Sequence, residues 1–489
     1  MSGNCTIEKQ EKTLQMKTKI IATIGPASSS KTVLKKLIFA GVDVFRLNFS
    51  HGTYSDFERI IRDIRELNSK LETHIPILAD LQGPKIRIGN VPGGQMVLKN
   101  GDKLIFTADR RGEAAGKIFV SYPDFPRDVH AGETLLLDDG KLTLQVISTD
   151  GYTDVQARVL IGGVLFPRKG VNLPDTRISL PSLSEKDKRD IKFIVEHVIE
   201  WVGLSFVRSA RDIEELISLI RESKAEYLPP VIAKIEKPEA VNDIDAILEV
   251  AHGVMIARGD LGVEVPLQTV PLIQKRIVKK CLQQAKPVII ATQMMEGMLN
   301  NSRPTRAEVN DVANSVMDGA DALMLSGETS VGKFPVESVE TMQKIISEVE
   351  NFEDIYHKQQ IPLIDHNPRF ISDAIIYSGC NMARTAQAKA IVSVASTGYS
   401  TAKIVSQRPK AIVFAFANND HILRRLNLLW GVKPLYFDRY INTDQTIADL
   451  MAIIKEKGLV QTGDLIVHIS NMPINEPGKS NMLKLSFVD

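Results

Sequence analysis

The stretch VIAKIEKPEAVNDIDAILEVAHGVMIARGD, residues 231–260, decides the fold of this chain. It holds two short apolar runs, Val231–Ile235 and Gly253–Ala257, on either side of an amphipathic segment of helical length. Runs rich in Val, Ile and Ala that alternate with such segments are typical of parallel strands in βα units, because those strands are buried on both faces. The stretch therefore predicts a strand, a helix and a second parallel strand.

The same pattern repeats on both sides of this stretch. Eight βα units in succession indicate a (β/α)₈ TIM barrel, in which functional groups lie at the C-terminal ends of the strands. The search for a site therefore concentrates on the residues that end each run. The eight predicted strands are Lys19–Ile24, Val42–Asn48, Ile75–Leu81, Trp201–Phe206, Val231–Ile235, Gly253–Ala257, Val288–Thr292 and Ala322–Ser326.

Two regions depart from the pattern of the barrel. Residues 87–182 show short strands joined by turns such as Asn100-Gly101-Asp102 and Asp139-Gly140, which indicates an inserted all-β domain. Because an insertion leaves from the top of a strand, this domain is expected to act as a lid over the barrel mouth. After residue 350 the alternation restarts as an α/β domain, with runs Ala390–Val394, Ala411–Phe416, Leu435–Phe437, Leu465–Ile469 and Leu483–Phe487.

The predicted organisation is therefore an α/β protein of three domains. Residues 1–86 and 183–350 form the barrel, residues 87–182 form the lid, and residues 351–489 form a C-terminal α/β domain. A chain of 489 residues is long enough for several domains with large cores.

Composition excludes several classes of partner. Lys and Arg number 60 and Asp and Glu 59, so the chain has no overall field that would attract nucleic acid or an anionic membrane. The three cysteines, Cys5, Cys281 and Cys380, show no disulfide or zinc pattern, which favours a reducing cytoplasm. No stretch is apolar enough to span a bilayer or to act as a signal peptide. We expect a soluble cytoplasmic protein.

Polar and charged side chains follow the predicted barrel strands. Any one of these groups could be an ordinary solvated strand end. Together they favour an anion and a divalent metal, because carboxylates hold Mg²⁺ while Arg and Lys hold phosphate oxygens. Phosphoryl transfer needs both. The groups are Arg46–His51, Asp80, Lys234–Glu236, Arg258–Asp260, Thr292–Gln293 and Ser326–Thr329.

Spacing adds detail at two strand ends. Lys234 and Glu236 lie two residues apart, so their side chains should project to the same face and share a ligand. Asp260 follows Gly259 directly after an apolar run, and a helical turn beginning there would offer free N–H groups to a carboxylate or phosphate. Asp260 could equally be an N-capping aspartate, and the two roles are compatible.

Ten motifs, in order and spacing, resemble pyruvate kinase across essentially the whole chain, and most closely its bacterial members that are activated by AMP or sugar monophosphates. The resemblance implies transfer of the phosphoryl group of phosphoenolpyruvate to ADP, giving pyruvate and ATP in the final step of glycolysis, through a Mg²⁺-stabilised enolate that is then protonated. It also implies a homotetramer. The motifs are Thr18–Pro26, Phe45–Gly52, Asp80–Arg87, Lys169–Pro174, Ser184–Asp187, Lys234–Glu236, Ala257–Val265, Ala291–Met294, Pro304–Glu308 and Asp318–Thr329.

The resemblance also assigns residues to roles. Glu236 and Asp260 match the Mg²⁺ ligands, and Mn²⁺ is expected to substitute. Lys234, Arg46 and Thr292 match catalytic residues: Lys234 contacts the transferring phosphoryl group and the enolate, Arg46 binds the phosphoryl group, and Thr292 positions a proton-donating water and touches the substrate carboxylate. Gly259 lies with them at the substrate. The nucleotide-side contacts match Asn48, His51, Arg87 and Lys169, and Asp139 is either a contact to the nucleotide-bound metal or a plain turn residue.

A departure from the family pattern concerns potassium. Many members have Thr-Lys where this chain has Leu81-Gln82 and Glu where it has Lys85, and those members need K⁺. The pocket of the family for this ion matches Asn48, Ser50 and Asp80, and Lys85 would supply a fixed charge near it. We therefore expect activity without K⁺; if Lys85 is instead a solvated surface residue, K⁺ is still required.

The turn after the run Ala390–Val394 resembles the effector loop of the family. Ser396, Thr397, Gly398 and Ser400 could form a phosphate cradle with the N–H groups of a following helix, for AMP or a sugar monophosphate. Ala395 and Thr401 differ from many members at the edges of this loop. The alternative is an ordinary capped helix start without a ligand.

Two other functions are compatible with a barrel top of this kind. A lyase or aldolase that handles pyruvate enolate with Mg²⁺ would leave the inserted domain, and Lys234 beside a metal ligand, without a purpose. A non-catalytic sensor would be expected to have lost site residues, whereas every expected acid and base is present. Pyruvate formation from phosphoenolpyruvate and ADP separates the three.

Overall fold

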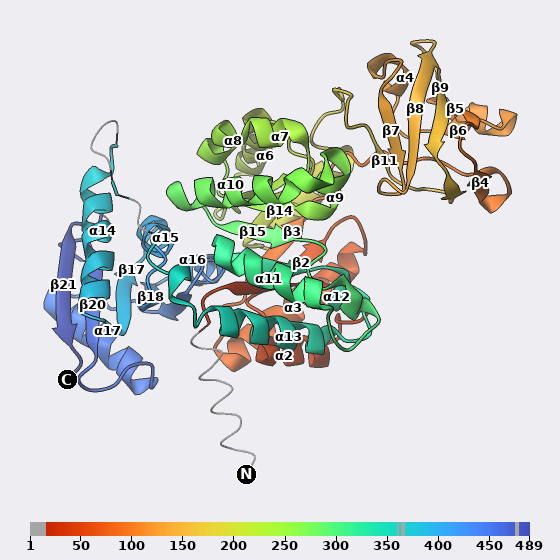
Figure 1. Ribbon diagram of the computed structural model, residues 1–489. Helices are drawn as coiled ribbons and strands as arrows, with labels where there is room; N and C mark the ends of the chain where they lie inside the picture. The colour runs from red at the N-terminus through yellow and green to blue at the C-terminus, as the bar shows by residue number, and fades with distance from the viewer. Residues whose placement is uncertain (1–15, 359–360, 363–366, 475–478) are drawn as a thin grey trace.

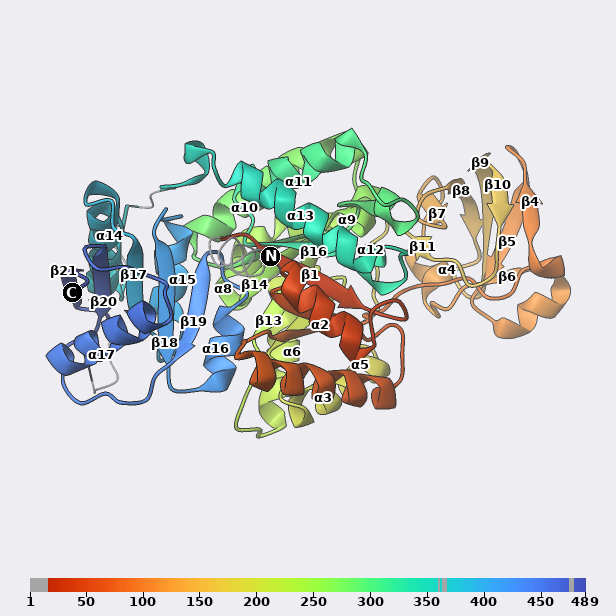
Figure 2. The ribbon, with the colours of Figure 1, turned by 90° about the horizontal axis from the view of Figure 1, so that it is seen from below.

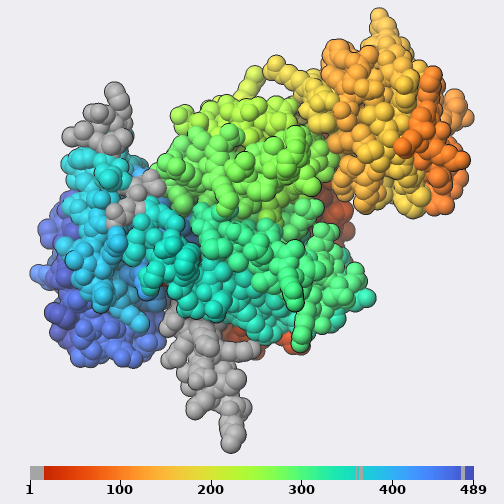
Figure 3. Space-filling model, viewed as in Figure 1, coloured from red at the N-terminus to blue at the C-terminus, as the bar shows by residue number. Residues whose placement is uncertain are grey.

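A computed structural model describes residues 16–358, 361–362, 367–474 and 479–489. Figure 1 shows a central barrel with a mostly β domain projecting from one end and an α/β domain packed at the other. The space-filling view in Figure 3 shows the same arrangement, with the outer part of the β domain standing clear of the barrel. The predicted three-part fold class is confirmed.

Eight parallel strands close the barrel in the order β1-β16-β15-β14-β13-β12-β3-β2. Each lies at a run predicted from the sequence, although several are shorter by one or two residues at one or both ends. Leu81, for example, lies just beyond the end of β3. The strands are β1 (Lys19–Ile24), β2 (Val44–Asn48), β3 (Ile77–Asp80), β12 (Trp201–Leu204), β13 (Val231–Ile235), β14 (Gly253–Ala257), β15 (Val288–Ala291) and β16 (Ala322–Leu325).

Helices surround this barrel, as the view from below in Figure 2 shows. Several begin with reciprocal capping boxes, such as Ser184 with Asp187 and Thr305 with Glu308, which satisfy N–H groups that the first turn leaves free. The helices are α2 (Lys31–Ala40), α3 (Tyr54–Leu71), α5 (Glu185–Glu196), α6 (Ala210–Glu222), α7 (Pro238–Asn242), α8 (Ile244–Val250), α9 (Arg258–Glu264), α10 (Val270–Gln283), α11 (Arg306–Asp318), α12 (Gly327–Ser330) and α13 (Pro335–Val349), with 3₁₀ turns η3 (Leu267–Thr269) and η4 (Glu296–Leu299).

The barrel interior is a packed core rather than a channel. Side chains such as Ile21, Val44, Ile232 and Met255 fill it, and Leu428 from the C-terminal domain joins the same cluster. Across the residues that the structure describes, we find no helix of sufficient length and hydropathy to span a membrane.

The inserted domain is built on a six-stranded sheet in the order β11-β7-β8-β9-β5-β6, with β10 paired to β4 beside it. Its expected turns are present: Gly101 and Gly140 have φ of 92° and 82°, a conformation that favours glycine. The elements are η1 (Pro92–Gly94), β4 (Met96–Leu98), β5 (Lys103–Thr107), η2 (Arg110–Ala115), β6 (Ile118–Phe119), α4 (Phe125–Asp128), β7 (Thr134–Leu137), β8 (Leu142–Thr149), β9 (Asp154–Ile161), β10 (Gly163–Leu165) and β11 (Val171–Asn172).

The C-terminal domain contains a five-stranded sheet in the order β19-β18-β17-β20-β21, with only β21 antiparallel. Helices α14 and α15 share a core with one face, and α17 packs on the other. The elements are η5 (Glu353–Ile355), α14 (Phe370–Thr385), β17 (Ala390–Val394), α15 (Tyr399–Ser406), β18 (Ile412–Ala417), α16 (Asp420–Leu426), β19 (Val432–Tyr436), α17 (Thr443–Glu456), β20 (Leu465–Ser470) and β21 (Met482–Phe487).

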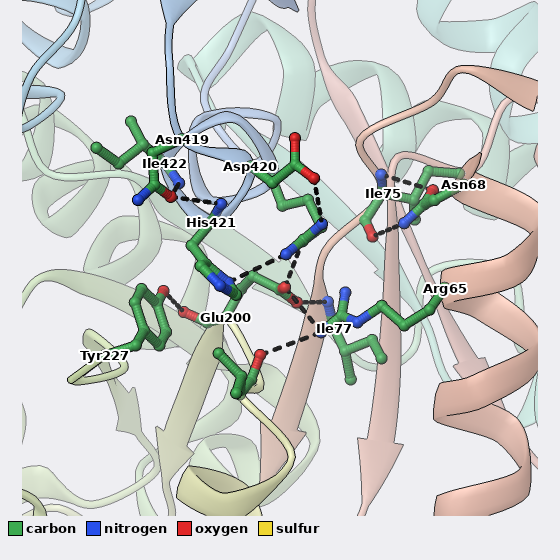
Figure 4. A network of polar contacts seen from close by, with 12 residues as sticks. Arg65, Asn68, Ile75, Ile77, Glu200, Tyr227, Asn419, Asp420, His421 and Ile422 are labelled. Atoms are coloured by element: carbon green, nitrogen blue, oxygen red, sulfur yellow. Dashed lines mark hydrogen bonds and ion pairs between the residues drawn. The ribbon is translucent and has the colours of Figure 1, made fainter. Parts of the chain in front are cut away.

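A buried ion-pair network joins this domain to the barrel (Figure 4). Glu200, at the start of β12, is fully buried; its Oε1 lies 2.7 Å from Arg424 Nε of α16 and 2.8 Å from Arg65 Nη2 of α3. Its Oε2 accepts the backbone N–H of Ile77 at 2.9 Å, at the start of β3. Tyr227 stacks on His421 beside it, with ring centroids 4.9 Å apart. One carboxylate therefore ties α16 to two barrel elements.

Candidate active site

Four charged side chains meet at the C-terminal ends of β2, β3 and β13. Arg46 Nε donates to Asp80 Oδ2 at 2.7 Å, and Lys234 Nζ lies 3.1 Å from Asp80 Oδ1 and 2.9 Å from Glu236 Oε1. All four are at most 9% exposed. Lys234 also donates to Ser205 Oγ at 2.7 Å. The expectation that Lys234 and Glu236 share one face agrees with this geometry.

Burial and mutual charge set the ionisation of this cluster. Burial would lower the pKa of Lys234, but Asp80 and Glu236 more than offset it, so that the pKa lies above its usual value. Burial would raise the pKa of Asp80, but Lys234 and Arg46 hold it below its usual value. The pKa of Glu236 is raised, first by burial and further by the neighbouring Asp260 carboxylate, against the lowering effect of Lys234. Lys234 is therefore a fixed positive charge at neutral pH.

Asp260 lies on α9, the helix that directly follows β14. It is the third residue of that helix and Ala257 is the capping position, so the alternative of an N-capping aspartate is not what the structure shows. The N–H of Gly259 donates to Thr292 Oγ1 at 2.7 Å. A Cβ on Gly259 would lie 3.1 Å from that same oxygen, which explains a glycine at this close approach.

Thr292 has an unusual backbone. Its φ is 67° and that of Gln293 is 53°, a region that a β-branched residue rarely adopts and that costs on the order of 1–3 kcal/mol. The buried Arg258 holds this turn, because its Nη2 donates to the carbonyls of Thr292 at 3.0 Å and Gln293 at 3.2 Å. Arg258 is itself paired with Asp311 at 2.6 Å. In this conformation the Thr292 hydroxyl lies against α9, where it accepts the N–H of Gly259.

Several of these partners were not assigned a role from the sequence. Ser205 bridges Lys234 and the carbonyl of Leu81, to which it donates at 2.7 Å. Thr23 accepts from Arg46 Nη1 at 3.0 Å. Ser205 lies at the end of a predicted strand, which was the available signal, whereas nothing in the sequence links Arg258 to Asp311.

The site fits a divalent cation held mainly by ligands from outside the protein. Glu236 and Asp260 are close enough for the charge of one to raise the pKa of the other. No group of three or more His, Cys, Asp or Glu side chains suited to a metal occurs among the described residues. Two carboxylates suffice for Mg²⁺, which usually keeps waters and takes substrate oxygens as its other ligands.

Other predicted residues lie at the edge of the barrel and in the inserted domain. Asn48 ends β2, and its Oδ1 accepts the N–H of Ser50 at 3.1 Å, with His51 exposed just beyond. Arg87 and Lys169 lie at the base of the inserted domain: Arg87 Nη1 donates to the carbonyl of Arg168 at 3.1 Å. Lys169 Nζ lies 2.8 Å from Asp138 Oδ1, next to Asp139 in the β7–β8 turn, where both aspartates have positive φ.

Lys85 lines a small crevice between the barrel and the inserted domain, together with Phe206, Asp260 and Glu264. This position places Lys85 on the side of Asp260. No contact joins it to Asn48 or Asp80 among those that the structure describes.

The predicted effector turn lines a cavity of about 360 Å³ in the C-terminal domain. Gly398 has φ of 86° and precedes α15, which begins at Tyr399 without a side-chain cap. Ser400 Oγ lies 2.8 Å from Ser480 Oγ, and Arg369 and Lys479 supply positive charge to the lining. Arg425 donates to the carbonyl of Thr397.

Comparisons with known proteins agree with one another. Residues 15–339 match the family model described as pyruvate kinase, barrel domain, and residues 373–486 match the one described as pyruvate kinase, alpha/beta domain. The chain is 44% identical over 484 residues to pyruvate kinase 2 of Synechocystis sp., covering 98% of this chain and 80% of that protein. It is 41% identical over 476 residues to the pyruvate kinase of Clostridium acetobutylicum, covering 97% of this chain and 100% of the relative.

A solved structure gives the same result. The crystal structure of a pyruvate kinase from Cryptosporidium parvum superimposes with a TM-score of 0.90 at 32% identity, covering 98% of this chain and 97% of that chain. Both the barrel and the C-terminal domain are thus accounted for, in sequence and in fold. The chain therefore belongs to the pyruvate kinase family, whose members transfer the phosphoryl group of phosphoenolpyruvate to ADP.

Proposed function

We propose that Arg46, Lys234, Glu236 and Asp260 carry the transfer of the phosphoryl group from phosphoenolpyruvate to ADP. The observation that supports this assignment is the buried Lys234 ammonium, held within 3.1 Å of Asp80 and 2.9 Å of Glu236 beside Arg46. Phosphoryl transfer depends on positioned charge rather than on covalent chemistry of the protein, and this cluster provides such charge.

Glu236 and Asp260 would hold Mg²⁺, with Mn²⁺ as a substitute. Such a cation, when bound, supplies positive charge to the phosphoryl oxygens and the enolate oxygen. The raised pKa of Glu236 would make binding of the cation sensitive to pH, because the carboxyl must ionise before it can serve as a ligand.

Lys234 and Arg46 stabilise charge as it develops. Because the pKa of Lys234 is raised, its ammonium stays charged at the leaving phosphoryl group and at the enolate, rather than giving up a proton. Arg46 uses three of its five N–H groups on Asp80 and Thr23, which leaves two for phosphoryl oxygens. Asp80 thus orients the side chains of both Arg46 and Lys234.

Thr292 and Gly259 would act at the enolate and the carboxylate. The Thr292 hydroxyl already accepts from the Gly259 N–H and donates to the carbonyl of Ala291 at 2.6 Å, so its lone pair direction is fixed. A hydroxyl is too weak an acid to be the proton source at neutral pH. We propose that it orients a water that protonates the enolate carbon.

The nucleotide would lie between the barrel edge and the inserted domain, against Asn48, His51, Arg87 and Lys169. Asp139 would approach the nucleotide-bound metal as the inserted domain, residues 87–182, closes on the barrel, residues 1–86 and 183–350. Lys85 would take the place of a monovalent cation, whose pocket in the family corresponds to Asn48, Ser50 and Asp80, so that K⁺ is not required.

The C-terminal domain, residues 351–489, would bind AMP or a sugar monophosphate, as in the bacterial members that the sequence resembles. The supporting observation is the cavity at Ser396, Thr397, Gly398 and Ser400, which has hydroxyls at the turn and includes Arg369 and Lys479 in its lining. These groups suit one phosphate.

A homotetramer is proposed on the basis of the family and of one exposed edge. Strand β21 ends the C-terminal sheet, and Leu485 and Phe487 on it are 40% and 64% exposed. An apolar edge of this kind favours pairing with a second copy. A cytoplasmic location fits the free, buried thiols of Cys281 and Cys380.

The test of the activity is a coupled assay. Purified protein should form pyruvate from phosphoenolpyruvate and ADP with Mg²⁺, and the rate should fall to background in excess EDTA and return with Mg²⁺ or Mn²⁺. Pyruvate formation that persists in EDTA would contradict the metal assignment, and its absence with the metal would contradict the function. Sedimentation velocity tests the tetramer.

A further inference from the structure

Glu264, the last residue of α9, joins three parts of the molecule. Its Oε1 accepts hydrogen bonds from Lys237 Nζ at 2.6 Å and from Asn172 Nδ2 at 2.7 Å. The side chain is 1% exposed, and its Oε2 is buried without a hydrogen-bond partner among the described residues. A buried carboxylate with only one oxygen satisfied is costly, so both donors to Glu264 matter.

Each of the three residues belongs to a part that the reaction must align. Lys237 directly follows Glu236, and Glu264 lies four residues after Asp260 on the same helix, hence on the same face. Asn172 lies on β11 of the inserted domain, three residues after Lys169. Through Glu264, both proposed metal ligands are thus connected to the domain that carries proposed nucleotide contacts.

The surrounding contacts identify this place as the joint between the two domains. In Figure 1 the strand β11 lies where the inserted domain approaches α9. The β7–β8 turn also reaches this helix, since a Cβ on Gly140 would lie 3.6 Å from Val263. Lys85, Asn172, Lys237 and Glu264 line one crevice there.

We propose that Glu264 is a positioning residue for phosphoryl transfer, and that its bond from Asn172 sets the inserted domain, with Arg87 and Lys169, relative to Glu236 and Asp260. The inference rests on the proposed function of those four residues. If the Asn172 side chain is removed, Lys237 still neutralises Glu264, so Glu236 and Asp260 should keep their geometry. The inserted domain, however, loses its hydrogen bond to Glu264. Nucleotide binding should therefore suffer, and phosphoenolpyruvate binding should not.

The experiment compares Asn172→Ala with the wild type in the full-length enzyme. A hydrogen bond to a charged group is typically worth about a factor of ten or more in an equilibrium constant. We expect the KM for ADP to rise about tenfold, with the KM for phosphoenolpyruvate and the affinity for Mn²⁺, measured by calorimetry without substrate, changed less than twofold. Asn172→Gln, which keeps an amide donor, should recover most of the loss.

Asn100→Ala is the matched control. Asn100 is an exposed residue of the same domain whose Oδ1 accepts the N–H of Gly162 at 2.9 Å, away from α9, so both KM values should stay at wild-type levels. Hydrogen exchange provides a readout without turnover: Asn172→Ala should speed exchange at residues 170–173 and leave the barrel strands unchanged.

Three results would overturn the proposal. The KM for ADP could stay unchanged in Asn172→Ala, both KM values could rise together, or kcat alone could fall. An inactive wild-type enzyme would instead contradict the proposed function, so the two failures are distinguishable.

Discussion

Replacing Lys234 by Met should nearly abolish turnover. The substitution removes a charge that lies within 3.1 Å of Asp80 and 2.9 Å of Glu236 while keeping an apolar chain of similar length. A positioned charge that acts on a developing anion is typically worth on the order of 3 kcal/mol or more. Since 1.36 kcal/mol corresponds to a factor of ten, kcat should fall at least about 100-fold.

The same substitution should also lower stability. It leaves Glu236 buried without its ammonium partner and Asp80 with Arg46 alone. Removing one partner of a buried ion pair typically costs about 3–5 kcal/mol. The pKa of Glu236, already raised by burial, should rise further, so that part of this cost is relieved by protonation and stability should recover as the pH falls.

Two measurements separate the catalytic effect from the structural one. The first is kcat from pyruvate formation at saturating substrates, and the second is the thermal midpoint from circular dichroism. Lys19→Met is the matched control, because Lys19 is also buried on a barrel strand and paired, to Asp43 at 3.3 Å, but at the opposite end of the barrel. It should lose stability and keep most of its turnover. A folded Lys234→Met enzyme that retains more than about a tenth of the wild-type rate would refute the assigned role.

Three further predictions concern other parts of the chain. In tetramethylammonium buffer, added KCl should stimulate activity less than tenfold and Lys85→Glu should create K⁺ dependence; a tenfold stimulation of the wild type would contradict the proposed role of Lys85. Ser400→Glu should keep basal turnover at saturating substrate but lose activation by AMP or sugar monophosphates, and unchanged activation would place the effector elsewhere. Burial lowers the pKa of His468 in β20 from 6.5 to about 4, so only the unfolded state takes up this proton between those pH values, and roughly 3 kcal/mol of stability should be lost as the pH falls through that window. In urea titrations His468→Phe should lack this part of the pH dependence, and equal slopes in both proteins would contradict it.

The sequence predicted the barrel because its signal is local. Each strand is a short apolar run, and polar or charged residues mark the point where the run ends. Lys234, Glu236 and Asp260 could therefore be assigned to one edge of the barrel from the sequence alone. The ends of the strands were less predictable, since Phe206 and Thr292 end predicted runs in the sequence but have positive φ and lie outside the strands. Periodicity carries no information on φ, so neither the positive φ of Thr292 nor the bond that its carbonyl accepts from Arg258 had a signal in the sequence.

The contacts that align the domains could not be predicted in this way. Asn172 and Glu264 are 92 residues apart, and each is an ordinary polar residue within its own segment. Both lie in motifs that identify the family, yet the motifs give no hint that the two meet. Pairwise contacts of this kind depend on how whole domains pack, which a single sequence does not encode in any local pattern.

The junction between the barrel and the C-terminal domain shows how the proposed effector turn is mechanically connected to the site. Arg425 of α16 donates to the carbonyl of Thr397 in that turn, and the preceding Arg424 is paired with Glu200 at 2.7 Å. Glu200 in turn accepts the N–H of Ile77, the first residue of β3, and β3 ends three residues later at Asp80.

An effector that displaces this turn must therefore either break the Arg425 contact or move α16 with it. The second course would pull on a buried ion pair, whose rupture is costly because it leaves Glu200 with Arg65 alone. Interfaces of this kind respond by switching between discrete arrangements rather than by gradual strain. Binding at the turn would thus favour one placement of the C-terminal domain against the base of β3, and would change the substrate concentration needed without touching Glu236 or Asp260.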